Sequence, residues 1–137
     1  TINAGAGNDT LTFAGLVSSA SIVGGLGDDS ILLSNTGFTG FNLAVANNVY
    51  YWEGGSDTIG FTASVTSGTV GTVFTAKVLD GQFTTVATQA GAGGVQVIGT
   101  TGSSTTVLAT FLGVTNTSAI VATTASASEF ASVTAIG

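Results

Sequence analysis

Apolar residues are spread along the whole chain in short runs, and glycine-rich segments break these runs. The pattern is typical of packed β structure, because strand side chains alternate between the two faces of a sheet and turns separate the strands. Beyond residue 62, strands are expected at Thr69–Leu79, Gln82–Thr88, Val95–Ile98, Thr105–Leu112, Ala119–Thr123 and Ser132–Ile136.

Three segments in this second half carry further local signals. The dipeptide Asp80-Gly81 is typical of a tight hairpin turn between two strands. The segment "AGAGGVQVI", residues 90–98, is either a coil that closes without metal or a glycine-rich hairpin, and we favour the hairpin. The segment "SASEFAS", residues 126–132, predicts a short helical turn, capped by Ser126 or Ser128, that covers one end of the fold.

The first half of the chain contains an internal repeat. "TINAGAGNDTLTF", residues 1–13, aligns without a gap with "SIVGGLGDDSILL", residues 21–33, so the period from position 9 to position 29 is 20 residues. A partial third copy, "YYWEGGSDTIGF" at residues 50–61, follows after 28 residues, and the extra length fits a loop around residues 34–40. The aligned aspartates are Asp9, Asp29 and Asp57, and the apolar residues two positions later are Leu11, Ile31 and Ile59.

Charged residues are few and almost all of them are acidic. They make up 6% of the chain, against about 25% in average domains, and seven acids against Lys77 alone give a net charge of −6. This balance argues against nucleic acid and anionic membranes as partners, and no apolar run approaches the roughly 18 residues of a membrane span. Because the chain has no cysteine, methionine or histidine, oxygen is its only abundant ligand atom, which favours a hard cation such as calcium.

The segments "AGAGNDTLT" and "GGLGDDSIL" are similar to the nonapeptide G-G-x-G-x-D-x-U-x of the RTX calcium-binding repeats, where U is a large apolar residue. The resemblance implies a parallel β-roll in which glycine-rich turns alternate with short strands and calcium lies between the turns of successive coils. The chain departs from the family pattern in two places. Residues 14–23 occupy the opposite half of a 20-residue coil, so calcium would line one edge only, and Glu53 replaces the second glycine of the third repeat.

The aligned turns supply the candidate calcium ligands. Asp9 and Asp29 face one gap between coils, and Asp29 and Asp57 face the next, so we expect about two ions. Calcium takes roughly six to eight oxygen ligands, so backbone carbonyls must join the carboxylates. The alternative is that these are ordinary glycine turns with solvated aspartates. The other candidate site residues are Gly5, Gly7, Gly25, Gly27 and Gly55, with Asn8 and Asp28 in a backbone or outer role.

These features predict an all-β fold, in which a parallel β-solenoid (β-roll) continues into a calcium-free, β-rich second half. Residues 1–62 form the calcium-binding roll, and residues 63–137 form a capping or assembly segment. No catalytic function is expected, because histidine is absent and no nucleophile has a base beside it. Glu53 near Trp52, Tyr50 and Tyr51 resembles a sugar-binding patch, although aromatic cover for the third coil is the favoured explanation.

We therefore expect an extracellular structural protein, secreted by or attached to the surface of a bacterium. It would bind calcium and assemble with copies of itself into a filament, sheath or surface layer, with a surface glycan as a further partner. The low charge favours assembly, because such a surface resists association weakly. The alternatives are a calcium-stabilised module of a large secreted adhesin and the calcium-binding appendage of a secreted hydrolase.

Overall fold

The computed structural model describes residues 2–13, 21–33, 48–65, 74–91, 93–114, 117 and 120–134. Within these ranges the chain is mostly β, as the sequence predicts, with one short helix. The elements are β1 (Ile2–Asn3), β2 (Thr10–Phe13), β3 (Ser21–Val23), β4 (Ser30–Leu33), β5 (Asn48–Tyr51), β6 (Asp57–Val65), β7 (Phe74–Leu79), β8 (Thr85–Gly91), β9 (Gly94–Thr101), β10 (Ser104–Val114), β11 (Ile120–Ala125) and α1 (Ala127–Thr134).

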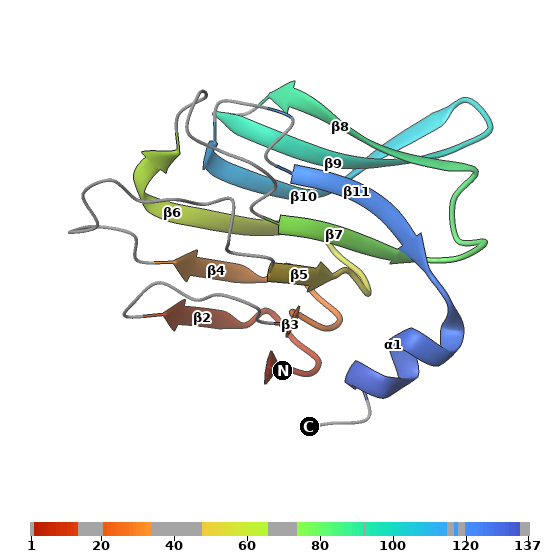
Figure 1. Cartoon of the computed structure of the whole chain (residues 1–137), viewed down its shortest axis with the longest axis horizontal. Helices are drawn as coiled ribbons and strands as arrows, with labels where there is room; N and C mark the ends of the chain where they lie inside the picture. Colours follow the sequence, from red (N-terminus) through yellow and green to blue (C-terminus); the bar gives the residue numbers. More distant parts are fainter. Residues whose placement is uncertain are drawn as a thin grey trace.

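The strands form two sheets (Figure 1). The first sheet has the order β1-β3-β5-β7-β11, and all its neighbouring strands are parallel. The second sheet has the order β2-β4-β6-β10-β9-β8, with parallel pairs up to β10 and antiparallel pairs beyond it. We call the strand pairs joined by glycine-rich turns coil 1 (residues 2–13), coil 2 (residues 21–33) and coil 3 (residues 48–65).

The register of the strands follows the sequence repeat. Neighbouring strands pair each residue with the aligned residue of the next repeat, at the offsets of 20 and then 28 residues found in the sequence. The insertion expected around residues 34–40 lies outside the described residues. The first sheet aligns Ile2, Ile22 and Tyr50, and the second sheet aligns Leu11, Ile31 and Ile59.

The second half of the chain extends both sheets and adds a hairpin. Strand β7 pairs with β5, and β10 pairs with β6 so that Ala109 is aligned with Asp57. Between β7 and β10 the chain forms the antiparallel strands β8 and β9, which meet at Gly91 and Gly94. The segment 90–98 is therefore a glycine-rich hairpin, which was the favoured prediction.

Two local predictions from the sequence are wrong. Asp80-Gly81 does not join paired strands, because β7 belongs to the first sheet and β8 to the second. The described part of the expected strand at residues 132–136 belongs to α1 instead. The Ser126 hydroxyl accepts a hydrogen bond from the Glu129 N–H at 3.2 Å, an N-terminal cap that favours helix, whereas a strand needs a partner that local sequence does not reveal.

Apolar side chains of both sheets fill the space between them, and α1 covers the outer face of the first sheet. The Tyr50 ring meets Phe111 edge-on in the core, at 6.3 Å between centroids. On the outer face, Phe130 of α1 packs edge-on against Tyr51 at 5.3 Å. Glu129 Oε2 accepts hydrogen bonds from the Tyr51 hydroxyl at 2.7 Å and from Lys77 Nζ at 2.6 Å.

Candidate functional site

The candidate site is the edge where three glycine-rich turns carry the chain from the first sheet to the second (Figure 1). The turns are residues 4–9 in coil 1, 24–29 in coil 2 and 52–56 in coil 3. A side chain is strained at positive φ, so glycine is strongly favoured wherever the turn requires that angle. Positive φ occurs at Gly5 (98°), Gly7 (118°), Gly25 (101°), Gly27 (123°) and Gly55 (77°).

The turns stack so closely that backbone carbonyls of one coil touch the glycines of the next. A Cβ atom added to Gly25 would lie 1.6 Å from the carbonyl oxygen of Gly5, and one added to Gly55 would lie 1.8 Å from that of Gly27. The Gly5 carbonyl also accepts a hydrogen bond from the Leu26 N–H at 3.1 Å. These carbonyls, predicted as calcium ligands, therefore take part in the stacking of the coils.

The three aligned aspartates form a ladder across the coils. Asp29 Oδ1 accepts a hydrogen bond from the Asp9 N–H, and Asp57 Oδ1 accepts one from the Asp29 N–H, both at 2.9 Å. Asp29 and Asp57 are buried, with 3% and 1% of their surface exposed. Each of them caps an amide of the preceding coil, and a hydrogen bond to a charged acceptor contributes about 1.5–3 kcal/mol.

The residues just before the aspartates form a second ladder that runs in the opposite direction. Asn8 Oδ1 accepts a hydrogen bond from the Asp28 N–H, and Asp28 Oδ1 accepts one from the Ser56 N–H, both at 2.9 Å. Each of these side chains caps an amide of the following coil. This exposed position therefore has a structural task that requires a short side chain with an oxygen acceptor.

The second carboxylate oxygen, Oδ2, has different surroundings in successive coils. In coil 3 the Tyr50 hydroxyl donates a hydrogen bond to Asp57 Oδ2. The residue aligned with Tyr50 in coils 1 and 2 is an isoleucine, which has no donor. Accordingly, the Oδ2 atoms of Asp9 and Asp29 are buried and have no hydrogen-bond partner within the described structure.

Burial shifts the titration of two of these carboxyl groups. It raises the pKa of Asp57 to about 7, although the hydrogen bond from the Asp29 N–H acts in the opposite direction. Burial also raises the pKa of Asp29, opposed by the hydrogen bond from the Asp9 N–H and assisted by the charges of Asp9 and Asp28. Neutralisation by a proton or by a cation therefore stabilises this edge.

The chemistry of these donors fits a hard cation. The orphaned Oδ2 atoms of Asp9 and Asp29 are anionic when ionised, and Asp29 Oδ2 packs directly over Gly24, where a Cβ would lie 2.5 Å from it. Among the described residues, no three aspartate, glutamate, histidine or cysteine side chains are grouped to hold a metal ion. Calcium bound by Asp9 and Asp29 would therefore need further oxygens from carbonyls or water.

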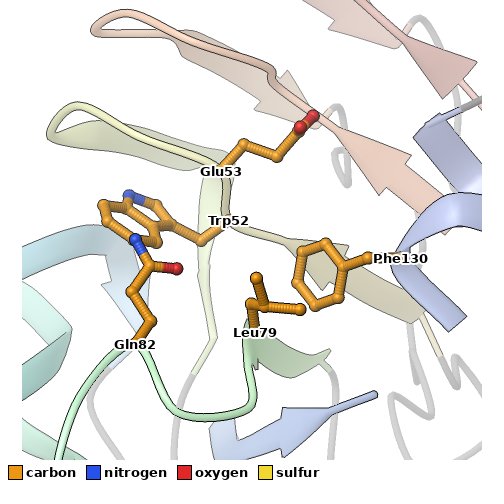
Figure 2. A pocket seen from close by; sticks show the side chains of 5 residues that line it. All are labelled: Trp52, Glu53, Leu79, Gln82 and Phe130. Atoms are coloured by element: carbon orange, nitrogen blue, oxygen red, sulfur yellow. The ribbon is translucent and has the colours of Figure 1, made fainter. Parts of the chain in front are cut away.

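A hollow of about 180 Å³ lies beside the third turn (Figure 2). The Trp52 indole N–H donates a hydrogen bond to the Gly55 carbonyl at 3.1 Å, and its ring packs against Phe83 at 5.7 Å between centroids. Only 7% of Trp52 and 8% of Phe130 is exposed, so both rings serve mainly as cover for the interior. The hollow is lined by Trp52, Glu53, Leu79, Gln82 and Phe130.

Two sets of interacting side chains were missed at the sequence level. Tyr50 could have been found, because it is the one hydroxyl-bearing residue in an aligned column that otherwise contains Ile2 and Ile22. The contact between Lys77 and Glu129 spans 52 residues and has no local signature.

Comparison with known proteins does not place the chain in a family. No protein-family model, no curated protein and no solved structure matches it. Among the helices in the described part of the chain, none is long and apolar enough to cross a membrane. The functional argument therefore rests on the sequence and on the geometry of the glycine-aspartate edge.

Proposed function

We propose that the chain is an extracellular structural module that binds calcium along its glycine-aspartate edge. The observation that carries this proposal is the pair of buried Oδ2 atoms on Asp9 and Asp29, which have no partner among the described residues. A buried ionised carboxylate is costly unless a donor or a cation compensates its charge. Calcium bound at Asp9 and Asp29 would supply that compensation and stabilise the stacked turns.

The architecture proposed for this module is a parallel β-solenoid of the kind implied by the RTX resemblance. Its support is the series of parallel pairs in which each of coils 1 to 3 contributes one strand to each sheet. The following level consists of β7 and β10, with the β8–β9 hairpin inserted between them. Ala109 takes the position of the aspartate there, so calcium belongs to the first three coils.

The affinity typical of extracellular calcium modules supports the proposed location outside a bacterial cell. Extracellular calcium modules bind the ion with dissociation constants of about 10⁻⁴ to 10⁻³ M. At ten times the dissociation constant, each ion adds about 1.4 kcal/mol to the stability of the folded state. The module would thus gain stability on reaching a calcium-rich medium, which suits a secreted or surface-attached protein.

Self-assembly into a filament, sheath or surface layer is the second part of the proposal. Its support is the apolar character of exposed positions on a chain with few charges: Leu26 is 58% exposed, Leu32 41% and Val121 40%. Such side chains lose contact with water when copies associate.

Electron microscopy tests the assembly directly. Ordered fibres or sheets are expected in millimolar calcium, and fewer or none in a chelator, because the metal stabilises the folded module. Single particles in both conditions at high protein concentration would contradict self-assembly and favour a module of an adhesin or of a secreted hydrolase.

The variant Asp29→Asn should abolish the response of stability to calcium. Asparagine retains an Oδ1 acceptor for the Asp9 N–H, so the ladder persists while the charge at Oδ2 is lost. We expect urea unfolding to show a gain of about 1–3 kcal/mol for the natural chain in millimolar calcium, and no gain for the variant. In a chelator the variant should be at least as stable as the natural chain, because it buries no charge.

The matched control for this experiment is Asp80→Asn, which removes a charge from an exposed turn. It should leave the calcium response unchanged. A natural chain that gains no stability from calcium, or an Asp29→Asn variant that gains as much, would rule out the proposed site.

A further inference from the structure

Several hydrogen bonds between successive coils recur from one contact to the next. Between coils 1 and 2, the Gly7 N–H donates to the Leu26 carbonyl at 2.8 Å and the Ser30 N–H to the Asp9 carbonyl at 2.8 Å. Between coils 2 and 3, the bond from the Thr58 N–H to the Asp29 carbonyl repeats the second of these at 2.8 Å. The two side-chain ladders also cross both contacts. The coil contact is therefore a repeated interface with fixed chemistry.

Coil 1 presents the same face without a described coil beneath it. Strands β1 and β2 are the outermost described strands at this end of their sheets. Ile2 is 38% exposed, whereas the aligned residues Ile22 and Tyr50 are 1% and 0% exposed. The aligned apolar side chains are thus buried in coils 2 and 3 and partly exposed in coil 1.

The polar groups on this open face can be assigned from their counterparts in coil 2. The N–H groups of Leu26, Asp28 and Ser30 each donate to coil 1. Their aligned counterparts are the N–H groups of Ala6, Asn8 and Thr10, which point by the same geometry to the open side. The acceptor on this face is Asp9 Oδ1. It corresponds to Asp29 Oδ1, which accepts the hydrogen bond from the Asp9 N–H at the contact between coils 1 and 2.

We propose that this open face is a docking site for one further glycine-aspartate coil, added in parallel and in the register of the repeat. The added segment must carry an asparagine or aspartate whose side-chain oxygen accepts the Asn8 N–H. It must also present, at the following residue, an N–H that donates to Asp9 Oδ1. Gly5 itself must remain glycine, because the added coil would place a carbonyl oxygen against it, as the Gly5 carbonyl oxygen lies against Gly25. This inference goes beyond the proposed function and does not require calcium.

The opposite end of a second copy does not offer this chemistry within the described residues. Its outermost strands are β11 and β8, and β8 is antiparallel to its neighbour. Already in β10, the strand next to β6, the residue before Ala109 is Leu108, which has no acceptor where the docking face requires an asparagine or aspartate; Ala109 is the residue aligned with Asp57. The partner is therefore another stretch of polypeptide with the Gly-x-Gly-Asn/Asp pattern, and not the far end of the same stack.

The test is a chain in which residues 1–20 are repeated once ahead of Thr1, studied in a chelator. Amide hydrogen exchange at Ala6, Asn8 and Thr10 of the original coil should slow at least about tenfold compared with the natural chain, because a docked coil protects these groups. The substitution Gly5→Ala in the original coil should remove this protection, since a methyl group there would meet the carbonyl of the added coil.

Two variants of the added copy test the predicted direction of the ladders. Asn8→Ala in the added copy removes the acceptor for the original Asn8 N–H and should reverse most of the protection. Asp9→Ala in the added copy changes only a side chain that faces away from the contact, so protection should remain. Unchanged exchange in the extended chain, or equal effects of the two variants, would overturn the docking proposal and leave the calcium experiment with Asp29→Asn unaffected.

Discussion

Gly25→Ala should destabilise the fold by more than about 3 kcal/mol, whereas Gly5→Ala should cost only about 1–2 kcal/mol. Both glycines occupy the same place in the turn, with φ of 101° and 98°, so the intrinsic strain of alanine is the same at the two sites. They differ in what a side chain would meet. A Cβ at Gly25 would lie 1.6 Å from the Gly5 carbonyl oxygen, and a Cβ at Gly5 has nothing within 4 Å.

The Gly25 variant therefore measures the closeness of the coil contact, and the Gly5 variant supplies the cost of the backbone angle alone. Gly81→Ala is a second control, because Gly81 also has a positive φ of 84° and open space around its Cα. Urea unfolding of the three variants at one pH gives the comparison. Equal losses at Gly25 and Gly5 would mean that the two turns are not stacked as described.

The stability of the chain should fall as the pH rises from about 4 to about 7. The pKa of Asp57 is raised by burial from its ordinary value near 3.8 to about 7, so between these values the folded state holds a proton that the unfolded state has released. Over the whole window the loss for this group amounts to up to about 4 kcal/mol, complete above the folded pKa. The raised pKa of Asp29 acts in the same direction.

Glu129 contributes a pH dependence of stability with the opposite sign. Its pKa is lowered by the hydrogen bond from Lys77 and then by that from Tyr51, so its contribution is present above its ordinary pKa and is lost as the pH falls through the lowered value. The chain should therefore be most stable in mildly acidic solution, and should lose the anchor of α1 only at lower pH.

Two variants separate Asp57 from the other acids. Asp57→Asn should flatten the pH dependence between about 4 and 7 and should be more stable than the natural chain at pH 8, because it retains the Oδ1 acceptor without a buried charge. Tyr50→Phe should cost about 1–3 kcal/mol at pH 8 and less at pH 5, since the lost donor matters most to the ionised carboxylate. Thermal unfolding in a chelator across this pH range measures both. An unchanged slope in Asp57→Asn would assign the pH dependence to other groups.

The sequence allowed the register of the first three coils to be predicted because the repeat is local and nearly gapless. Asp9, Asp29 and Asp57 are aligned in the structure as they are in the sequence, and so are Leu11, Ile31 and Ile59. The positions that share a column could therefore be known before the fold. The direction in which each carboxylate points was not predictable, because it depends on which backbone amides remain unpaired after the coils stack.

The second half was less predictable because its partners are distant. The sequence predicts strands near β7 to β11, but Asp80-Gly81, which predicts a hairpin, connects two different sheets. A turn dipeptide determines the local backbone conformation. It does not determine which strands the segments on either side of it will pair with. The glycine pattern at residues 90–98 predicted the hairpin correctly, because β8 and β9 are adjacent in the sequence and their pairing is local.

The position of Lys77 gives this chain a simple conformational reporter. Lys77 is its only lysine or arginine, so trypsin has one site in 137 residues. That site lies inside β7, which is hydrogen-bonded to β5 on one side and to β11 on the other, and its amine is held by Glu129 of α1. A protease needs an extended, unpaired segment, so cleavage requires that α1 leave the sheet and that β7 separate from its neighbours. The rate at which two fragments appear therefore reports how often the first sheet opens. Gel electrophoresis can compare this rate between conditions that stabilise or destabilise the coils.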